Sequence, residues 1–418
     1  MPTVWQSEGA AALLSEEAVP IVELAVTREV DVNRHAYEQS SRLATVIRNI
    51  SPDVLDIHEE PFSVAARQWL AAAPAGLPIV MYTAQNIDKR FPPPFAQYER
   101  AALRRVAAMY PCTAQAASVA RGKGFTGLIE VLPLGFEDAM FYPGSQSVAD
   151  EELVLGLFGR LVPEKGVVDA VQILAQVHAV RPTRLVVVGS GPEEASVRAL
   201  AAQLSVSDRL DLLPWQSTAE LASTYRLTHV VLIPSRATQT WVEQFGRVIV
   251  EAQASGAVVA GYASGSIGEV AGEAALLKEV GDVHRLAADI TELAADGTAF
   301  DERRARGIAL SKTRTWTRVA ERQADLYRRV AAGDVARVQQ PRSPKRRRAA
   351  ARAEFGPTAA SSAGVRSGVR PQLRQRASPR ARVPILRSGD PQLRQRASPV
   401  CGYPSCTAVN QLPGRRPH

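Results

Sequence analysis

Short apolar segments alternate with amphipathic patterns along most of the chain, and this alternation limits the possible fold more than any other feature. Before residue 140 the apolar runs are VPIVELAV, DVLDIH, LPIVMYT and AAMYPC. Such continuous runs are typical of strands buried in a parallel sheet. Between them lie RHAYEQSSRLATVIRNI, FSVAARQWLAAA and YERAALRRVAA, which have the apolar spacing of amphipathic helices. The β-α-β-α order predicts an α/β fold with a doubly wound parallel sheet.

A second series of the same kind follows a polar Pro/Gly/Ser-containing link at residues 142–152. Its predicted strands are LVLGLFGR, RLVVVGSG, LDLLPW, HVVLIPS and AVVAGYAS. Helices are predicted at 167–178, 193–204, 218–225, 247–255, 268–271 and 317–332. We therefore divide the chain into a first Rossmann-like domain, a second Rossmann-like domain, a terminal helix and a tail, at residues 1–145, 146–314, 315–334 and 335–418.

The tail carries all of the basic character of the chain. Residues 335–418 contain 18 Lys/Arg and 2 Asp/Glu, a net charge of +16. The whole chain has 50 and 42, so residues 1–334 keep 32 basic and 40 acidic residues, a net of −8. The high pI therefore does not indicate a nucleic-acid-binding fold, and we expect no specific nucleic acid partner. Because apolar periodicity stops and Arg, Ala, Pro, Ser and Gly dominate, the tail is predicted to be disordered.

The cysteines and the lack of long apolar segments indicate the cellular compartment of the protein. Three cysteines without a C-x-x-C spacing indicate a reducing environment rather than a disulfide framework. No stretch of about 18 uninterrupted apolar residues is present, and the start MPTVWQSEGAAALLSEEA lacks the features of a signal peptide. We expect a cytoplasmic protein.

The loop GRLVPEKG places two cations at the carboxyl end of a predicted strand. Arg160 and Lys165 lie five residues apart, and Gly159 allows the backbone to approach a ligand closely. Ligands of open α/β sheets bind at this edge, and Arg and Lys together suit a diphosphate. A turn with two solvated cations explains the spacing equally well.

The turn VVVGSGPEE also connects a strand to a helix. Gly189 and Gly191 resemble the start of a dinucleotide fingerprint, but Glu194 stands where the third glycine belongs. We therefore interpret the segment as a tight turn and expect no nicotinamide cofactor.

The stretch WVEQFGRVIVEAQASG, residues 241–256, predicts a helix that begins at Phe245-Gly246-Arg247. Free N–H groups and the helix dipole make such an N-terminus an anion site. Glu243 precedes the helix and Glu251 lies about two turns inside it, so the two carboxylates could hold sugar hydroxyls on either side of a diphosphate. For an isolated pair at this spacing, Glu251 is more often a solvated helix residue.

Together and in this order, these motifs resemble the donor domain of the retaining glycosyltransferases of family 4 (glycosyl transferases group 1). GRLVPEKG, VVVGSGP, LIPS, EQFGRVIVEAQASG and YASGSIGEV carry the resemblance, from about Val154 to Val330. PDVLDIHEEPFS and VLPLGFEDAMFYP are similar to family segments of the first domain and the hinge. The resemblance implies the GT-B fold, with two facing Rossmann-like domains and a terminal helix that crosses back to the first.

The resemblance also implies a function. A nucleotide-diphosphate sugar would donate its sugar to a hydroxyl acceptor, such as a saccharide or a lipid-linked sugar, with retention at the anomeric carbon. Arg160, Lys165 and the N–H groups of residues 245–247 would hold the diphosphate, while Glu243 would contact the sugar and Glu251 the ribose. No cofactor or metal is expected, and the sequence contains no D-x-D motif.

The first domain departs from the family pattern. We find no Gly-Gly loop after a first strand, so the domain is expected to be incomplete, and a truncated, inactive remnant or a binding protein is an alternative. A nucleotide-sugar epimerase on the same fold is another. Where relatives carry a histidine, the candidates on the acceptor or sugar side are Gln85 and Asn86, with His58 as a further candidate or a structural residue. Lys89, Arg90, Arg100, Arg104 and Arg105 form either a solvated face or a contact with the inner face of the membrane.

Overall fold

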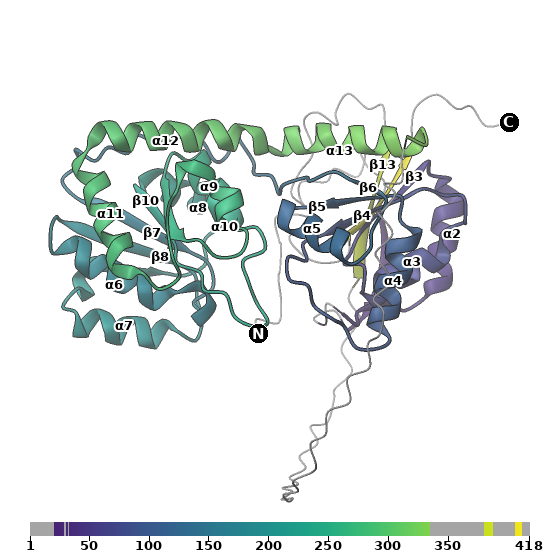
Figure 1. The fold of residues 1–418 in the computed structure, drawn as a ribbon, viewed down its shortest axis with the longest axis horizontal. Coiled ribbons are helices and arrows are strands. Elements are labelled where there is room, and N and C mark those ends of the chain that lie inside the picture. The colour runs from purple at the N-terminus through teal and green to yellow at the C-terminus, as the bar shows by residue number, and fades with distance from the viewer. Residues whose placement is uncertain (1–20, 29–30, 32, 335–379, 388–405, 412–418) are drawn as a thin grey trace, which may run out of the picture.

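The structure is a computed structural model that describes residues 21–28, 31, 33–334, and the strands at 380–387 and 406–411. It consists of two α/β domains that lie side by side, with helices covering the sheet of each (Figure 1). None of the helices in these ranges is long and apolar enough to cross a membrane.

The first domain alternates strands and helices in the predicted order. Its helices are α2 (Ser40–Ile50), α3 (Val64–Ala72), α4 (Phe95–Arg105) and α5 (Ala114–Gly122). Its strands are β1 (Ile21–Thr27), β2 (Ala36–Tyr37), β3 (Val54–His58), β4 (Ile79–Thr83), β5 (Ala108–Pro111) and β6 (Leu128–Ile129). Of the predicted strands, β3, β4 and β5 pair in parallel in chain order, and the unpredicted β6 continues this order. The predicted parallel strand β1 instead pairs antiparallel with its neighbours. The sequence analysis did not predict α5, because this short helix buries only Ala116 and Ala120 and has little apolar contrast.

The second domain holds a parallel sheet of strand order β12-β11-β10-β7-β8-β9. These strands are β7 (Leu153–Phe158), β8 (Thr183–Val188), β9 (Leu210–Leu213), β10 (Val230–Ile233), β11 (Val258–Tyr262) and β12 (Leu276–Lys278). The predicted helices appear as α6 (Val167–His178), α7 (Glu194–Gln203), α8 (Thr218–Leu227), α9 (Arg247–Ala254) and α10 (Ile267–Ala271). Two further helices, α11 (Val283–Ala295) and α12 (Gly297–Ser311), were not predicted.

Helices cover both faces of the second sheet. On one face, α6 and α11 bury side chains such as Val171 and Ile290 against Leu155 of the central strand β7. On the other, α8 and α9 pack Tyr225 and Ile249 into a separate apolar cluster. This second cluster continues into the first domain through Ala84 and Cys112, which follow β4 and β5. Apolar packing therefore joins the carboxyl ends of the two sheets.

The terminal helix α13 (Trp316–Ala331) follows the second domain in the chain but packs on the first (Figure 1). Its Leu326 and Val330 share an apolar cluster with Val54 and Val80 of the first sheet. Next to this cluster, the α13 hydroxyl of Tyr327 donates to Asp56 Oδ2 at 2.5 Å, and Gln323 donates to the same atom at 3.2 Å. The helix thus crosses between the domains, as the resemblance implied.

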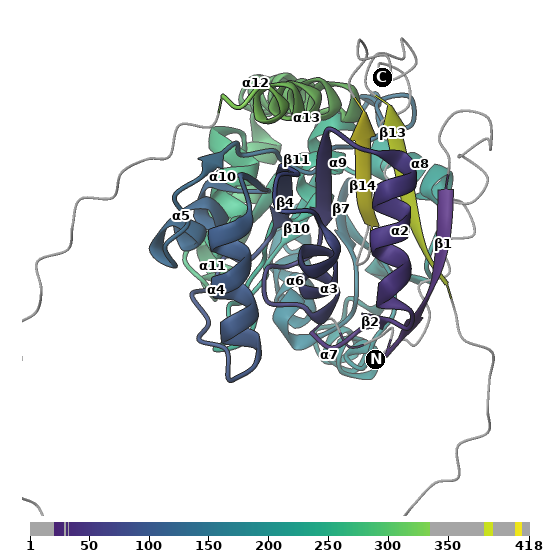
Figure 2. The same cartoon turned by 90° about the vertical axis from the view of Figure 1, so that its right-hand side faces the viewer.

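Two segments of the tail lie in the first sheet as strands β13 (Arg380–Arg387) and β14 (Cys406–Gln411). They pair parallel with each other and antiparallel with β1 and β3, so they lie between these two strands (Figure 2). At these two segments the structure differs from the predicted lack of secondary structure. The backbone groups along β1 and β3 need hydrogen-bond partners, and the short apolar stretches VPIL and TAV are compatible with strands. The rest of the tail lies outside the described residues.

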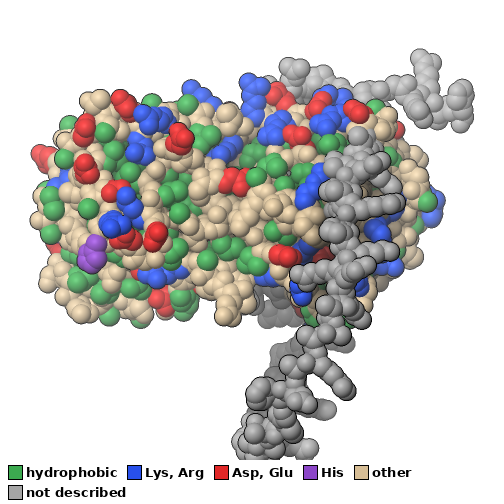
Figure 3. Space-filling view, viewed as in Figure 1, with side chains coloured by type: hydrophobic (Ala, Val, Ile, Leu, Met, Phe, Trp, Pro, Cys, Tyr) green, Lys and Arg blue, Asp and Glu red, His purple; other side chains and the backbone are tan. Residues whose placement is uncertain are grey.

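Charged side chains of both signs are interspersed over the face of the molecule shown in Figure 3. Two members of the basic cluster in the first domain bind backbone carbonyls. Lys89 donates to Thr240 O at 2.8 Å, and Arg105 donates to Pro74 O and Leu77 O, both at 2.8 Å. At least these two side chains therefore serve the fold.

We expect Asp56→Asn to change how the free energy of unfolding depends on pH. Burial raises the pKa of Asp56 to about 7, although the hydrogen bonds from Tyr327, Tyr110 and Gln323 oppose this shift. The folded state therefore favours the protonated carboxyl, and its stabilising contribution is complete below about pH 4 and is lost as the pH rises through about 7. In urea unfolding at several pH values, the variant should lose less stability than the wild type over this range. Asp138→Asn, on an exposed turn, is the control, and parallel profiles for all three proteins would contradict the prediction.

Candidate functional site

The loops after β7 and β8 close tightly on each other at the carboxyl edge of the second sheet. Leu161 N–H donates to Ser190 O at 2.9 Å, and Gly159 N–H donates to Val188 O at 2.9 Å. Gly189 has a φ of +142°, and a Cβ at this position would lie 2.0 Å from the carbonyl oxygen of Gly159. A Cβ at Gly191 would lie 2.3 Å from Leu161 O. The predicted glycines are therefore needed for loop packing, whatever they do for a ligand.

Lys165 and Glu243 form an ion pair at this edge. The Nζ–Oε2 distance is 2.5 Å, and the two side chains are 24% and 11% exposed. Lys165 ends a short 3₁₀ segment after β7, and its ammonium also lies 5.3 Å from the centre of the Trp241 ring. Glu243 belongs to the loop that leads from β10 to α9. The structure thus brings together two residues that the sequence placed in one site.

The N-terminus of α9 lies at the end of the Glu243 loop and has no capping side chain. Gly246 is its N-cap residue, with a left-handed φ of +78° that favours glycine. Free N–H groups of a first helical turn attract anions. Phe245 is buried, whereas the side chain of Arg247 is exposed. Arg160, two residues after β7, is exposed as well. The predicted cations and the helix terminus therefore lie on one edge of the sheet.

Glu251 is buried and points between α8 and α9. Its Oε2 accepts from the Tyr225 hydroxyl at 3.2 Å, and its Oε1 lies 3.1 Å from Arg247. Burial and the Glu251 charge raise the pKa of Tyr225 well above its ordinary value, so the tyrosine remains a donor. Glu251 is therefore a buried and paired carboxylate, and not the solvated helix residue that an isolated motif favours.

A second ion pair, which the sequence analysis missed, fixes the loop after β10. Arg236 donates to Asp169 of α6 from its Nε and Nη2 atoms at 2.7–3.0 Å, and Tyr262 of β11 donates to the same carboxylate at 2.7 Å. Arg236 N–H also donates to Glu164 O at 2.8 Å. These contacts tie the loop that carries Glu243 to the loop that carries Lys165. No sequence pattern indicated this pair, because an arginine after a strand is usually solvated.

The first domain contacts the same loop from across the interface. The Asn86 amide donates to Glu243 O at 2.9 Å, and Gln244 donates to Ala84 O at 3.1 Å. Asn86 is therefore placed beside the backbone of Glu243, and its role toward a sugar stays a prediction. Gln85 is buried in the first domain instead, where its amide faces Glu99 and Lys123 at 3.3 and 3.1 Å. The structure thus separates the two neighbouring candidates.

His58 lies at the end of β3, stacked on Tyr82 with 4.1 Å between the ring centres. Its Nδ1 is 3.2 Å from the Tyr110 hydroxyl, and burial lowers its pKa to about 4, so the ring is neutral at pH 7. These contacts fit the structural role that the sequence left open for it. Nearby Glu60 accepts from Ala84 N–H and from the Thr83 hydroxyl, and burial raises the pKa of this carboxyl to about 7.

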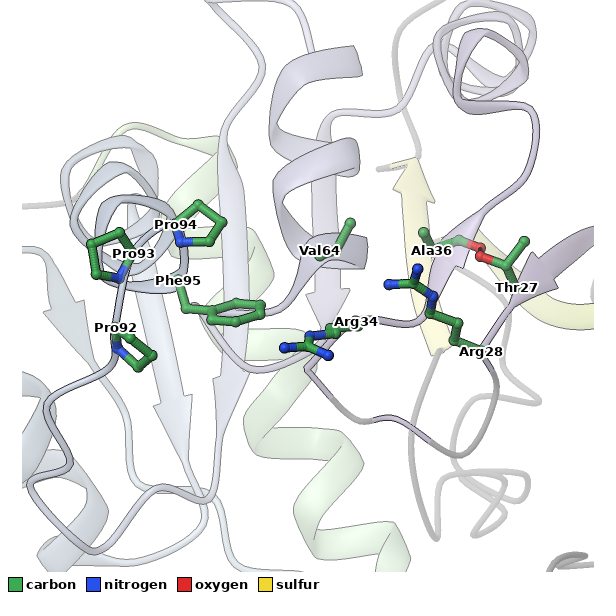
Figure 4. A pocket seen from close by; sticks show the side chains of 9 residues that line it. All are labelled: Thr27, Arg28, Arg34, Ala36, Val64, Pro92, Pro93, Pro94 and Phe95. Carbon is green, nitrogen blue, oxygen red and sulfur yellow. Dashed lines mark hydrogen bonds between the residues drawn. The ribbon is translucent and has the colours of Figure 1, made fainter. Parts of the chain in front are cut away.

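A cavity of about 560 Å³ opens on the first domain, at the carboxyl ends of β1 and β4. Arg28 and Arg34 come from the loop after β1, and Phe95 begins α4, and these side chains face a common space (Figure 4). The Arg34 guanidinium carbon lies 6.0 Å from the centre of the Phe95 ring. None of the predicted site residues lines this cavity; its lining consists of Thr27, Arg28, Arg34, Ala36, Val64, Pro92, Pro93, Pro94 and Phe95.

The second domain is similar to a known protein family. Residues 141–311 match the family model described as Glycosyl transferases group 1. A D-inositol 3-phosphate glycosyltransferase of Segniliparus rotundus is 36% identical over 143 residues, which cover 31% of each chain. One of Acidothermus cellulolyticus is 34% identical over 220 residues, which cover 48% of each chain. The matches thus span less than half the length of these relatives.

Solved structures match over both domains. The Anabaena protein HepE in complex with UDP and glucose has a TM-score of 0.56 at 19% identity, over 69% of this chain and 82% of HepE. Sucrose-phosphate synthase from Thermosynechococcus elongatus has a TM-score of 0.55 at 21% identity, over 71% and 80% of the two chains. At these identities the likeness shows the fold, and it confirms the predicted GT-B architecture.

Gly189→Ala should destabilise the protein, because the new methyl group would collide with the Gly159 carbonyl and the φ of +142° disfavours a side chain. Strain of this kind costs about 1–3 kcal/mol. Gly122→Ala is the matched control, since a Cβ there meets nothing within 4 Å. Thermal unfolding of both variants measures the difference. An unchanged melting temperature for Gly189→Ala would contradict the close approach of Gly189 to the Gly159 carbonyl.

Proposed function

We propose that this protein is a glycosyltransferase that moves a sugar from a nucleotide-diphosphate sugar to a hydroxyl acceptor, with retention and without a metal ion. The observation that carries the proposal is the Lys165–Glu243 pair, 2.5 Å apart, in the loops that meet at the uncapped N-terminus of α9. The family match of residues 141–311 and the UDP and glucose in the HepE complex support it. Retention follows the resemblance to family 4.

Transfer of the sugar requires stabilisation of the negative charge on the leaving diphosphate. When the bond between the sugar and the diphosphate breaks, negative charge accumulates on the leaving phosphate oxygen. Fixed cations and backbone N–H groups aimed at that position lower the barrier without rearranging. Lys165, Arg160 and the first N–H groups of α9 are the groups that we assign to this role. The Glu243 carboxylate then accepts hydrogen bonds from sugar hydroxyls, and the buried Glu251 accepts them from the ribose.

Lys165→Ala should weaken the binding of a nucleoside diphosphate about 10- to 150-fold, since a hydrogen bond to a charged group contributes about 1.5–3 kcal/mol. Calorimetric titration of the full chain with UDP, GDP and ADP measures this and also identifies the base. Lys312→Ala, an exposed lysine at the end of α12, is the control and should bind as the wild type does. Failure of a folded wild-type sample to bind any of the three would favour the inactive remnant.

Product analysis separates transfer from the epimerase alternative. A transferase releases the nucleoside diphosphate and places the sugar on an acceptor, whereas an epimerase acts on the nucleotide sugar itself. Proton NMR of the anomeric signal of the product tests retention, and an unchanged rate in the presence of a chelator tests metal independence.

The first-domain cavity suits an acceptor that carries a negative group. Arg28 and Arg34 line it beside the apolar surfaces of Phe95 and Pro94, and relatives of the chain are named for transfer to D-inositol 3-phosphate. We therefore assign the acceptor side to this cavity.

Arg34→Ala should raise the KM for a phosphorylated cyclitol about 10-fold or more and leave the KM for the donor unchanged, because only the acceptor phosphate loses a cation. Steady-state kinetics with the phosphorylated acceptor and its unphosphorylated form provide the measurement. Equal KM changes for both acceptors would place the phosphate elsewhere.

A further inference from the structure

Trp215 is an exposed indole directly after β9. Its side chain and backbone are 55% exposed, whereas Trp69 is fully buried and the other two tryptophans of the described ranges, Trp241 and Trp316, are partly buried. Large exposed aromatic side chains often mark binding sites. The segment that holds Trp215 is well anchored, because Ser217 begins α8 with a capping box that includes Glu220.

The sheet register places this indole in line with the candidate diphosphate site. Phe158 pairs with Val188, and Val188 pairs with Leu213, at the ends of β7, β8 and β9. Two residues beyond each of them are Arg160, Ser190 and Trp215. Neighbouring strands are about 4.8 Å apart, so the exits of β7 and β9 are about 10 Å apart along this edge.

The indole is also oriented toward the site. Its Nε1–H donates to Ser190 Oγ at 3.0 Å, and Ser190 belongs to the Gly189–Gly191 turn that packs on the Arg160 loop. The hydrogen bond uses the edge of the ring, and 55% of the residue is exposed to solvent. An aromatic ring held beside a phosphate site can stack on a planar group at the other end of the same ligand.

We propose that Trp215 stacks on the base of the donor nucleotide while the diphosphate lies at Lys165 and the N-terminus of α9. This inference rests on the proposed function and extends it to the nucleoside end of the donor. Every nucleobase has a π-face, so stacking supplies affinity without choosing between bases, and alanine substitution of a stacking residue weakens binding about 5- to 150-fold. Trp215 is a binding residue and takes no part in bond cleavage.

The test is titration of the full chain with UDP, GDP and ADP, and with inorganic pyrophosphate. Trp215→Ala should weaken the nucleotide that the wild type binds by about 5- to 150-fold and leave pyrophosphate binding unchanged. Trp215→Phe should stay within about threefold of the wild type, because a phenyl ring still stacks. The matched control is Leu227→Ala, which truncates an apolar residue that is 71% exposed at the far end of α8. Nucleotide should also quench tryptophan fluorescence more in the wild type than in Trp215→Phe, which keeps only Trp241 beside Lys165.

Each other outcome overturns the inference. Wild-type nucleotide affinity in Trp215→Ala would remove Trp215 from the donor site while the proposed function stands. Equal weakening of nucleotide and pyrophosphate, or quenching of undiminished size in Trp215→Phe, would show that Trp215 only supports the loop. If the folded wild type binds none of the three nucleotides, the proposed function fails and this inference fails with it.

Discussion

The peptide segment around Glu243 is held from three directions, and the geometry of the candidate site depends on it. The carbonyl oxygen of Glu243 accepts from the Asn86 amide at 2.9 Å and from Ser266 N–H at 3.1 Å, while the Glu243 carboxylate binds Lys165. Asn86 belongs to the first domain, and the other two residues belong to separate loops of the second. The position of the Glu243 carboxylate is therefore coupled to the contact between the domains, and a separation of the domains would remove one of its three constraints.

Two further contacts of different character hold the domains together. The Glu269 carboxylate of α10 accepts from Ala114 N–H at 2.6 Å and Gln115 N–H at 3.3 Å, so it caps helix α5 of the other domain. This polar contact can exchange with water, and interfaces of this kind permit relative motion of domains. By contrast, α13 buries apolar side chains and the Asp56 site, so it moves with the first domain. The short 3₁₀ segment at Lys312–Arg314, which joins α12 to α13, is where such a motion would be absorbed.

The sequence predicted most strands and helices of both domains, because strands of a parallel sheet are continuous apolar runs. It also grouped Lys165 with Glu243, since the carboxyl ends of neighbouring strands share one edge. It missed Arg236 and Glu269, because their partners come from distant segments and a charged residue in a loop or a short helix resembles any solvated one. At the end of β4 it proposed both Gln85 and Asn86, yet only Asn86 reaches Glu243, because adjacent residues point in different directions and periodicity alone does not say which faces the interface.

The two ion pairs of the site indicate how its charged side chains could exchange their present partners for groups of a ligand. Each carboxylate of the motif is paired with a cation, Glu243 with Lys165 and Glu251 with Arg247. A diphosphate that attracts Lys165 would release Glu243 to the sugar hydroxyls. The two side chains are only 24% and 11% exposed, so an unpaired Glu243 carboxylate would be destabilising and the hydroxyls would have to replace the lost contact. Glu251 is buried to a similar degree, with 8% of its side chain exposed, and an unpaired charge there would also be destabilising. Its hydrogen bond from Tyr225 would persist if Arg247 turned to a phosphate, and in the proposed complex the ribose hydroxyls would replace the lost contact. The tyrosine thus allows the second pair to open without leaving a bare carboxylate in the protein interior.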